Sequence, residues 1–430
     1  MSKYFGTDGI RGVAGEELTA RTAFALGNAL CRLKKRPLVV VGQDTRTSSD
    51  MLALALSAGV TAGGGSVLAG GVLPTAAVAF FVRRCKADFG VMVSASHNPP
   101  AYNGLKVFDA HGFKLGEKSE ERAERYFDEY AFASALSCGR CRRLPRRGAY
   151  ADHLVSCGVP LAGKKFVVDC ANGAAGEFAP RVFGRLGAQV VAVGRSRDGR
   201  KINGGCGALH PAALARIVRE TGADAGFAYD GDADRLIAAD EKGEIVDGDR
   251  ILCILAADLA ESGALPQGIA VGTSHTNTGA ERWLAARGIR LLRTDVGDRY
   301  VSECMRRTGA AVGGEQSGHV ILSAFSTTGD GILTSVRLAR LIESAPLSVL
   351  ADIRLLPQCN VSVRVRDKVR TLGSEGGRAA VARESGKVAR LVVRASGTEP
   401  VVRIFAEAET ARAASAAAEG VRRAVLSEEE

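Results

Sequence analysis

A serine lies at the point where an apolar strand must give way to a turn. Residues 89–93 are apolar, and residues 94–100 read SASHNPP. The two prolines after Asn98 cannot continue a strand or the interior of a helix, so a bent loop is predicted. Such a loop would hold the hydroxyl of Ser96 in the open, with His97 directly after it. This placement suits a serine that carries a transferable group.

Three carboxylates at alternate positions form a second chemically suggestive segment, Asp230, Asp232 and Asp234, with Arg235 directly after them. Carboxylate oxygens are ligands that Mg²⁺ prefers, and a neighbouring arginine suits a phosphate. An EF-hand is a poorer match because Arg235 stands where that loop needs a glycine. A solvated acidic turn is the plainer alternative. Together with Ser96, the aspartates suggest phosphoryl transfer through a phosphoserine.

Two more loops are dense in hydrogen-bonding groups. Residues 394–400 read RASGTEP between two predicted strands, so hydroxyls, backbone N–H groups freed by Gly397, and the guanidiniums of Arg394 and Arg403 could cradle a phosphate. Residues 313–319 read GGEQSGH and suit sugar hydroxyls or an amine. An ordinary hairpin loop and an ordinary surface turn are the respective alternatives.

Apolar strands alternate with helical patterns along most of the chain, which predicts several α/β units with mostly parallel sheets. Strands are expected at 38–42, 66–69, 89–93, 165–170, 189–193, 268–272 and 289–293, and helices at 49–62, 75–87, up to 186, and around 279–287. The last 75 or so residues differ, with strands at 360–365 and 391–393 and an alanine-rich helix at 411–426, typical of a smaller α+β piece. No convincing sequence repeat is visible, only a repeated pattern.

Length and composition limit which classes of protein the chain can belong to. A chain of 430 residues is too long for one ordinary core, and a formal charge of +10 favours anionic partners, whether phosphorylated metabolites or nucleic acid. Residues 51–82 carry no charge, but glycines and Pro74 divide them, so buried core is predicted instead of a membrane span. Ten cysteines without a pairing framework favour reduced thiols and a cytoplasmic location. The basic cluster at 140–147 is expected to be a solvated loop or a linker.

These segments together resemble the α-D-phosphohexomutase superfamily, in that family's order and nearly end to end. Within the superfamily they are most similar to the bacterial branch that acts on glucosamine phosphates. The matching segments are 4–12 (YFGTDGIRG), 94–99 (SASHNP) with 103–106 (NGLK), 230–235 (DGDADR), 296–301 (VGDRYV), 314–319 (GEQSGH) and 394–400 (RASGTEP).

The resemblance implies a heart-shaped molecule around a central cleft. Three consecutive α/β domains with mostly parallel mixed sheets would be followed by a smaller α+β domain like the TATA-binding protein. The expected domains are 1–148 with the phosphoserine loop, 149–247 with the metal loop, 248–355 with the sugar loop and 356–430 with the phosphate loop.

The resemblance also implies the roles of the site residues. Ser96 would be the phosphoserine, and Mg²⁺ would be held by the Ser96 phosphate with Asp230, Asp232 and Asp234. Arg11, Lys106 and Arg235 would surround the transferring group. Glu315, Ser317 and His319 would hold the sugar, and the distal phosphate would be held by Arg394, Ser396, Gly397, Thr398 and Arg403. His319 is the preferred proton acceptor, with His97 and Lys106 as alternatives.

The implied activity interconverts D-glucosamine 6-phosphate and D-glucosamine 1-phosphate through a 1,6-bisphosphate, on the route to UDP-N-acetylglucosamine and cell-wall precursors. Mg²⁺ and glucosamine or glucose 1,6-bisphosphate, as phosphoryl activator, are the expected cofactors. The expected partner is a phosphosugar, with no nucleic acid, no membrane and a possible homodimer. Alternatives are a phosphomannomutase/phosphoglucomutase of the same superfamily, a phosphoserine-based sugar-phosphate hydrolase, and a nucleic-acid binder suggested only by the charge.

Overall fold

The computed structural model describes residues 4–6, 8–127, 137–396 and 400–428. The chain divides into two compact units. The first contains Met1–His275 and Gly288–Asp352, and the second contains Thr276–Arg287 and Ile353–Glu430. The ten cysteines are all free thiols. Within the described residues, no helix combines the length and the apolar character needed to cross a membrane.

One arrangement of strands and helices occurs three times along the chain, in the order β-α-β-α-β-β. The first repeat contains β2 (Leu38–Gln43), α2 (Ser49–Ala62), β3 (Ser66–Val72), α3 (Thr75–Cys85), β4 (Phe89–Val93) and β5 (Tyr102–Phe108). The second contains β7 (Lys165–Asp169), α6 (Ala175–Arg185), β8 (Gln189–Val193), α7 (Pro211–Thr221), β9 (Ala225–Tyr229) and β10 (Leu236–Asp240). The third contains β12 (Ile269–Thr273), α9 (Thr278–Ala285), β13 (Arg290–Thr294), α10 (Asp298–Thr308), β14 (Val312–Gly314) and β15 (Val320–Leu322).

The strand order within each sheet repeats as well. The sheets run β5-β4-β2-β3, β10-β9-β7-β8 and β15-β14-β12-β13, so each repeat places its fourth, third, first and second strands side by side. The first three strands of each repeat are parallel, and the fourth returns antiparallel beside the third. Parallel neighbours need a helical crossover, whereas the antiparallel pair needs only a hairpin loop. Each repeat therefore has one hairpin loop at the end of its third strand.

The remaining elements of the first unit extend the sheets or cover them. Strands β1 (Ile10–Val13), β6 (Cys141–Arg143) and β11 (Ile245–Val246) add to sheet edges. The added helices are α1 (Ala20–Leu33), α4 (Glu117–Glu124), α5 (Ala149–Ser156), η1 (Gly199–Lys201), α8 (Gly248–Glu261), η2 (Pro266–Gly268), α11 (Gly331–Ile342) and α12 (Leu347–Leu350). Part of the basic cluster predicted to be a loop or linker is thus β6, a short exposed strand paired with β3.

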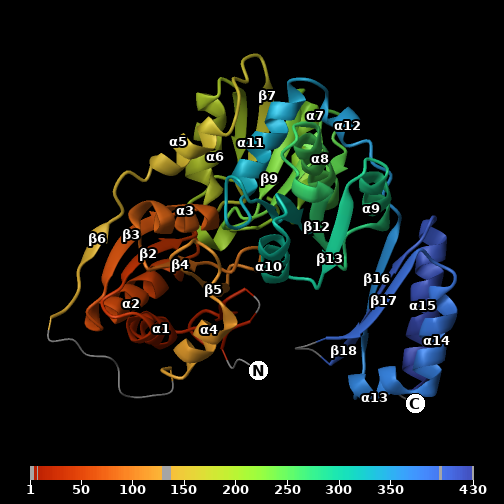
Figure 1. Cartoon of the computed structure of the whole chain (residues 1–430), viewed down its shortest axis with the longest axis horizontal. Helices are drawn as coiled ribbons and strands as arrows, with labels where there is room; N and C mark the ends of the chain where they lie inside the picture. The colour runs from red at the N-terminus through yellow and green to blue at the C-terminus, as the bar shows by residue number, and fades with distance from the viewer. Residues whose placement is uncertain (1–3, 7, 128–136, 397–399, 429–430) are drawn as a thin grey trace. The chain divides into compact units, whose positions relative to one another are not determined.

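The uncharged stretch 51–82 is core, as predicted. In Figure 1, α1 and α2 cover one face of the first sheet and α3 covers the other, as right-handed crossovers in opposite directions require. Helices α1 and α2 touch backbone to backbone, because a Cβ at Gly59 would lie 2.1 Å from the carbonyl oxygen of Phe24. The glycine-rich sequence therefore serves close helix packing.

The second unit is a smaller α+β piece (Figure 1, blue). Its strands β16 (Gln358–Arg364), β17 (Arg390–Ala395) and β18 (Val401–Glu407) form an antiparallel sheet with β18 in the centre. Its helices are α13 (Lys368–Gly373), α14 (Glu375–Ser385) and α15 (Ala411–Ser427). Helix α9 comes earlier in the chain but also belongs to this unit, because its contacts group it with these elements. The core joins alanines and valines of α15 to inward residues of the sheet such as Val402 and Ile404.

Candidate active site

The three hairpin loops that follow β4, β9 and β14 meet in the first unit. They are the loops that contain Ser96, the three aspartates and His319. Ser96 Oγ donates a hydrogen bond of 2.5 Å to Asp230 Oδ2, which joins the first loop to the second. Arg235 and His319 form an isolated antiparallel bridge, which joins the second loop to the third. Equivalent positions of three repeats thus supply one candidate reaction centre.

Ser96 has a left-handed backbone, with φ of 53°, which a residue other than glycine adopts only when its surroundings hold it. Its N–H donates to Ser94 Oγ at 2.8 Å, and Ser94 in turn donates to Asp44 at 2.7 Å. Its carbonyl oxygen accepts from Asn203 at 2.9 Å. The loop therefore presents the Ser96 hydroxyl in one fixed direction.

Arg46 binds this loop most extensively, and sequence reasoning missed it. Its side chain is fully buried and donates to the carbonyl oxygens of Pro99, Tyr102, Ser96 and Asn98 at 2.5 to 2.9 Å, while its Nε binds Asp44. The sequence did contain a signal for it, because Asp44 and Arg46 directly follow a buried parallel strand. Functional sites in α/β proteins lie beyond the carboxyl ends of such strands.

We expect Arg46→Lys to lower kcat by about 10- to 100-fold with little change in KM. Lysine keeps the charge but cannot bind four carbonyl oxygens from one planar group, so the serine would be misplaced. Steady-state kinetics would measure this, with Arg84→Lys on the exposed end of α3 as the matched control. Equal kinetics for the two variants would contradict the positioning role.

The three aspartates are arranged as a cation site. Each offers a carboxylate oxygen, and these oxygens lie within 4.8 Å of one another. Ala233 has φ of 58°, which turns the loop sharply enough for the three side chains to converge. One oxygen of Asp232 and one of Asp234 are buried without a hydrogen-bond partner among the described residues. Orphaned buried carboxylate oxygens fit a hard divalent cation such as Mg²⁺.

Burial and the charges of Asp234 and Asp232 raise the pKa of Asp230 well above its usual range. A cation bound between the three side chains would remove this repulsion. The donor set and its electrostatics therefore both favour metal binding, with Asp230, Asp232 and Asp234 as the ligands from this loop.

Lys106 supplies a positive charge that is paired with the aspartates. Its Nζ is buried and lies 2.8 Å from Asp232, 2.8 Å from Asp234 and 3.3 Å from Asp8. Burial alone would lower the pKa of Lys106, but Asp232 and Asp234 raise it well above its usual value. Lys106 therefore stays charged, which favours a histidine over it as proton acceptor.

We expect Lys106→Met to lower the free energy of unfolding by about 3–5 kcal/mol in the presence of EDTA, because the two buried carboxylates Asp232 and Asp234 lose their cation. Excess Mg²⁺ should restore part of the loss by binding the folded state. Urea denaturation with and without metal would measure both effects, and Lys118→Met, on the exposed side of α4, is the control. If Mg²⁺ did not change the loss of unfolding free energy, Lys106 would not be coupled to the metal site.

A cavity of about 360 Å³ opens in front of these loops, a size that suits a sugar phosphate. The predicted residues that line it are Arg11, His97, Asp234, Arg235, Glu315, Ser317 and His319. Asp8, Val296, Gly297 and Asp298 complete the lining. The N–H of Gly297 donates a hydrogen bond of 3.0 Å to Glu315 Oε1, which orients this side chain. Many of the residues predicted to contact the reacting phosphate or the sugar thus lie around one hollow, whereas Ser96 and Lys106 are outside its lining.

The two histidines of the cavity have different electrostatic surroundings. Burial and the cations Arg235 and Arg11 lower the pKa of His97 to about 4, so it is neutral at pH 7. Burial would also lower the pKa of His319, but the charge of Asp234, whose Oδ1 lies 3.7 Å from His319 Nδ1, raises it above its usual value. The carboxylate beside His319 stabilises its protonated form, whereas the two arginines beside His97 oppose protonation, which favours His319 as the group that takes up the proton.

The predicted phosphate-binding residues lie in the second unit. Arg394 of β17 is directly opposite Arg403 of β18, which places both guanidiniums on one face of the sheet. The carbonyl oxygen of Ser396 accepts from Lys368 at 2.5 Å, so a further cation that the sequence did not reveal lies beside this loop. Gly397 and Thr398 lie outside the described residues.

Four family models match the chain in order. They describe the alpha/beta/alpha domains I, II and III and the C-terminal domain of phosphoglucomutase/phosphomannomutase, over residues 2–134, 149–243, 247–355 and 360–424. The chain belongs to the phosphoglucomutase/phosphomannomutase family. The resemblance found in the sequence is therefore confirmed, and so is the predicted fold class of three α/β domains with mixed sheets and a smaller α+β domain.

Individual members of the family agree with this assignment. A phosphoglucosamine mutase of Symbiobacterium thermophilum is 48% identical to this chain, and the match covers 98% of the chain and 99% of the relative. A phosphoglucomutase/phosphomannomutase family protein of Burkholderia thailandensis has a similar structure, with a TM-score of 0.84, 27% identity, and coverage of 98% and 97%.

A further solved structure, at lower identity, has a similar fold. N-acetylphosphoglucosamine mutase of Aspergillus fumigatus, solved with GlcNAc-6P and magnesium, has a TM-score of 0.70 at 18% identity and covers 100% of this chain and 96% of its own.

Proposed function

We propose that the protein is an isomerase that interconverts D-glucosamine 6-phosphate and D-glucosamine 1-phosphate through a phosphoserine at Ser96. The single observation that supports this best is the Ser96 hydroxyl, 2.5 Å from Asp230, beside buried carboxylate oxygens that need a cation. The choice of an aminosugar rests on relatives named phosphoglucosamine mutase, which are 44–48% identical over nearly the whole chain.

In the proposed reaction, a phosphoryl group on Ser96 Oγ is attacked by the free hydroxyl of the substrate. The phosphorus–Oγ bond breaks, a new phosphorus–oxygen bond forms, and the hydroxyl proton passes to His319. The product of this step is a 1,6-bisphosphate. After it turns over in the site, the reverse transfer returns its other phosphoryl group to Ser96 and releases the isomer.

The protein's part in this transfer is positioning and charge. Asp230, Asp232 and Asp234 would hold Mg²⁺, which supplies positive charge to the transferring oxygens. Arg11 and Arg235 line the same cavity and would add cationic donors to those oxygens, while Lys106 keeps the aspartates paired. We assign the sugar to Glu315, Ser317 and His319, and the distal phosphate to Arg394, Ser396, Gly397, Thr398 and Arg403.

The proposal includes the wider setting of the reaction. Glucosamine or glucose 1,6-bisphosphate would load Ser96 at the start, and the product would enter UDP-N-acetylglucosamine and cell-wall precursor synthesis in the cytoplasm. A homodimer is part of the same prediction.

Substrate comparison tests the proposed function. We expect kcat/KM for glucosamine 6-phosphate to exceed the values for glucose 6-phosphate and mannose 6-phosphate. A preference for the neutral sugars would support the phosphomannomutase/phosphoglucomutase alternative. Release of inorganic phosphate faster than isomerisation would support a hydrolase instead.

A further inference from the structure

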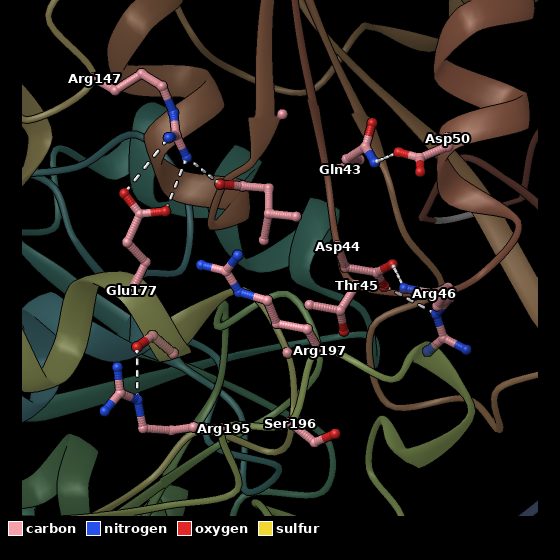
Figure 2. A pocket seen from close by; sticks show the side chains of 14 residues that line it. Gln43, Asp44, Thr45, Arg46, Asp50, Arg147, Glu177, Arg195, Ser196 and Arg197 are labelled. Carbon is pink, nitrogen blue, oxygen red and sulfur yellow. Dashed lines mark hydrogen bonds and ion pairs between the residues drawn. The ribbon is translucent and has the colours of Figure 1, made fainter.

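A second cavity, of about 520 Å³, lies in the first unit (Figure 2). None of its lining residues belongs to the cavity that contains His97 and His319. Its walls are the turn Asp44–Arg46 after β2, the end of β3, the beginning of α6, and the segment Arg195–Arg197 after β8, with Arg147 at one side. The proposed function gives this cavity no role.

Besides Arg46, which binds the Ser96 loop, three arginines line it. Arg147 binds Glu177 at 3.3 Å and the carbonyl oxygen of Val72 at 2.7 Å, and Arg195 binds the carbonyl oxygen of Gly176 at 3.2 Å. Arg197 extends into the view of the cavity in Figure 2 and makes no hydrogen bond or ion pair with any described residue. These side chains leave N–H donors for an anion.

The backbone adds to the same environment. Helix α6 begins at Ala175, and no side chain caps its first turn. The N-terminal end of the helix carries a partial positive charge, and Gly173 and Gly176 beside it line the cavity, although the N–H groups of these two glycines already bind the carbonyl oxygens of Cys170 and Gly173. Arginine side chains and a helix N-terminus together suit a phosphate monoester.

The rest of the lining indicates what the phosphate is attached to. Gln43, Asp50 and Ser196 carry polar groups that suit sugar hydroxyls, and Gln43 and Asp50 already share one hydrogen bond with each other. None of the 14 described residues that line the cavity is aromatic, so a nucleobase would have no ring to stack on. The chemistry therefore favours a sugar phosphate over a nucleotide.

The two main walls of the cavity also support the two loops of the reaction centre. Arg46, in the first wall, holds four carbonyl oxygens of the Ser96 loop. In the second wall, the N–H of Ala174 donates to the carbonyl oxygen of Gly231 in the aspartate loop at 2.9 Å.

The walls are in direct contact with each other. Thr45 Oγ1 donates to the carbonyl oxygen of Asn172 at 2.6 Å, and a Cβ at Gly199 would lie 2.3 Å from the carbonyl oxygen of Thr45. A ligand that bridges the walls would therefore change how Ser96 and Asp230 are held relative to each other.

We infer that this cavity is an effector site for a sugar phosphate, bound by Arg147, Arg195 and Arg197, and that its occupancy changes the rate of phosphoryl transfer at Ser96. The site is separate from the substrate site, and its binding test does not depend on the proposed function.

Inorganic phosphate is the probe for binding, measured by isothermal titration calorimetry on the full chain. The active site also suits phosphate, so wild type should show two binding events. Arg195→Gln with Arg197→Gln should weaken one event by about tenfold or more and leave the other unchanged. The matched control is Arg200→Gln, three residues further along, which pairs with Asp198 and is outside the cavity lining. A single event in wild type, or equal weakening in the control, would overturn the site.

Kinetics test the coupling. The substrate is itself a sugar phosphate and would fill the second site at saturation, so initial rates are measured with substrate well below KM. Phosphate then competes at the active site of both proteins, and the double variant reports that competition alone. We expect phosphate to change the wild-type rate by about fivefold or more beyond its effect on the double variant. The double variant should match wild type when phosphate is absent, which also shows that it is folded. Binding at the second site with equal effects of phosphate on both rates would overturn the coupling.

Discussion

Replacing Ser96 with alanine should remove the mutase activity almost completely, with kcat lower by about 10⁴-fold or more, because the reaction loses the oxygen that carries the phosphoryl group. The fold should be retained, since among the described residues Ser96 Oγ bonds only to Asp230 and His97. Coupled-assay kinetics and the intact mass of protein incubated with glucose 1,6-bisphosphate would measure the effect. The variant should gain no phosphoryl mass.

Ser94→Ala is the matched control for this experiment. Ser94 is buried two residues earlier in the same loop and bonds to Asp44 and to the N–H of Ser96, so its loss should lower kcat while phosphorylation persists. Phosphoryl mass on the Ser96→Ala protein, or loss of it from the Ser94→Ala protein, would place the acceptor elsewhere.

Asp232→Asn should lower kcat by about 10³-fold or more at low Mg²⁺. The change removes one negative charge from the site, so a divalent cation binds more weakly and less of the transferring charge is offset. Activity measured against Mg²⁺ concentration should show a half-maximal value shifted to higher metal. Excess Mg²⁺ should recover part of the rate.

Asp240→Asn serves as the control for the loss of a buried carboxylate. Asp240 is buried at the far end of β10, where its side chain accepts N–H groups of the turn that leads to β11. It should lower stability but leave the Mg²⁺ dependence of the folded enzyme unchanged. An unshifted metal dependence in Asp232→Asn would contradict the proposed ligand set.

Much of this architecture could be predicted from the sequence because its strands are short, apolar and regularly spaced. The ranges predicted for β4 and α2 agree with the observed Phe89–Val93 and Ser49–Ala62. The site loops could be predicted because proline, glycine and clustered charge mark where each hairpin leaves its sheet. The threefold repeat is visible as a pattern but not as similar residues, since burial constrains polarity more than identity.

Other features depend on contacts between distant residues, which no local pattern records. Arg46 binds carbonyl oxygens more than 50 residues away, and carbonyl groups leave no trace in side-chain sequence. Helix α9 follows β12 in the chain, yet Asn277 at its start bonds to Leu356 and Thr278 bonds to Glu407, so it belongs to the second unit. Domain boundaries and the roles of individual site residues stay predictions until variants are measured.

The three equivalent hairpins have a consequence for how such an enzyme can diversify. The serine that carries the phosphoryl group, the ligands of the cation and the residues that bind the sugar are each assigned to a different hairpin. Each hairpin connects two strands of its own sheet. Under these assignments, sugar preference would change through residues 315–318, while His319, the proposed proton acceptor, and the hairpins at 94–101 and 230–235 would keep the phosphoryl transfer. Grafting this third hairpin between members should transplant specificity without rebuilding the reaction.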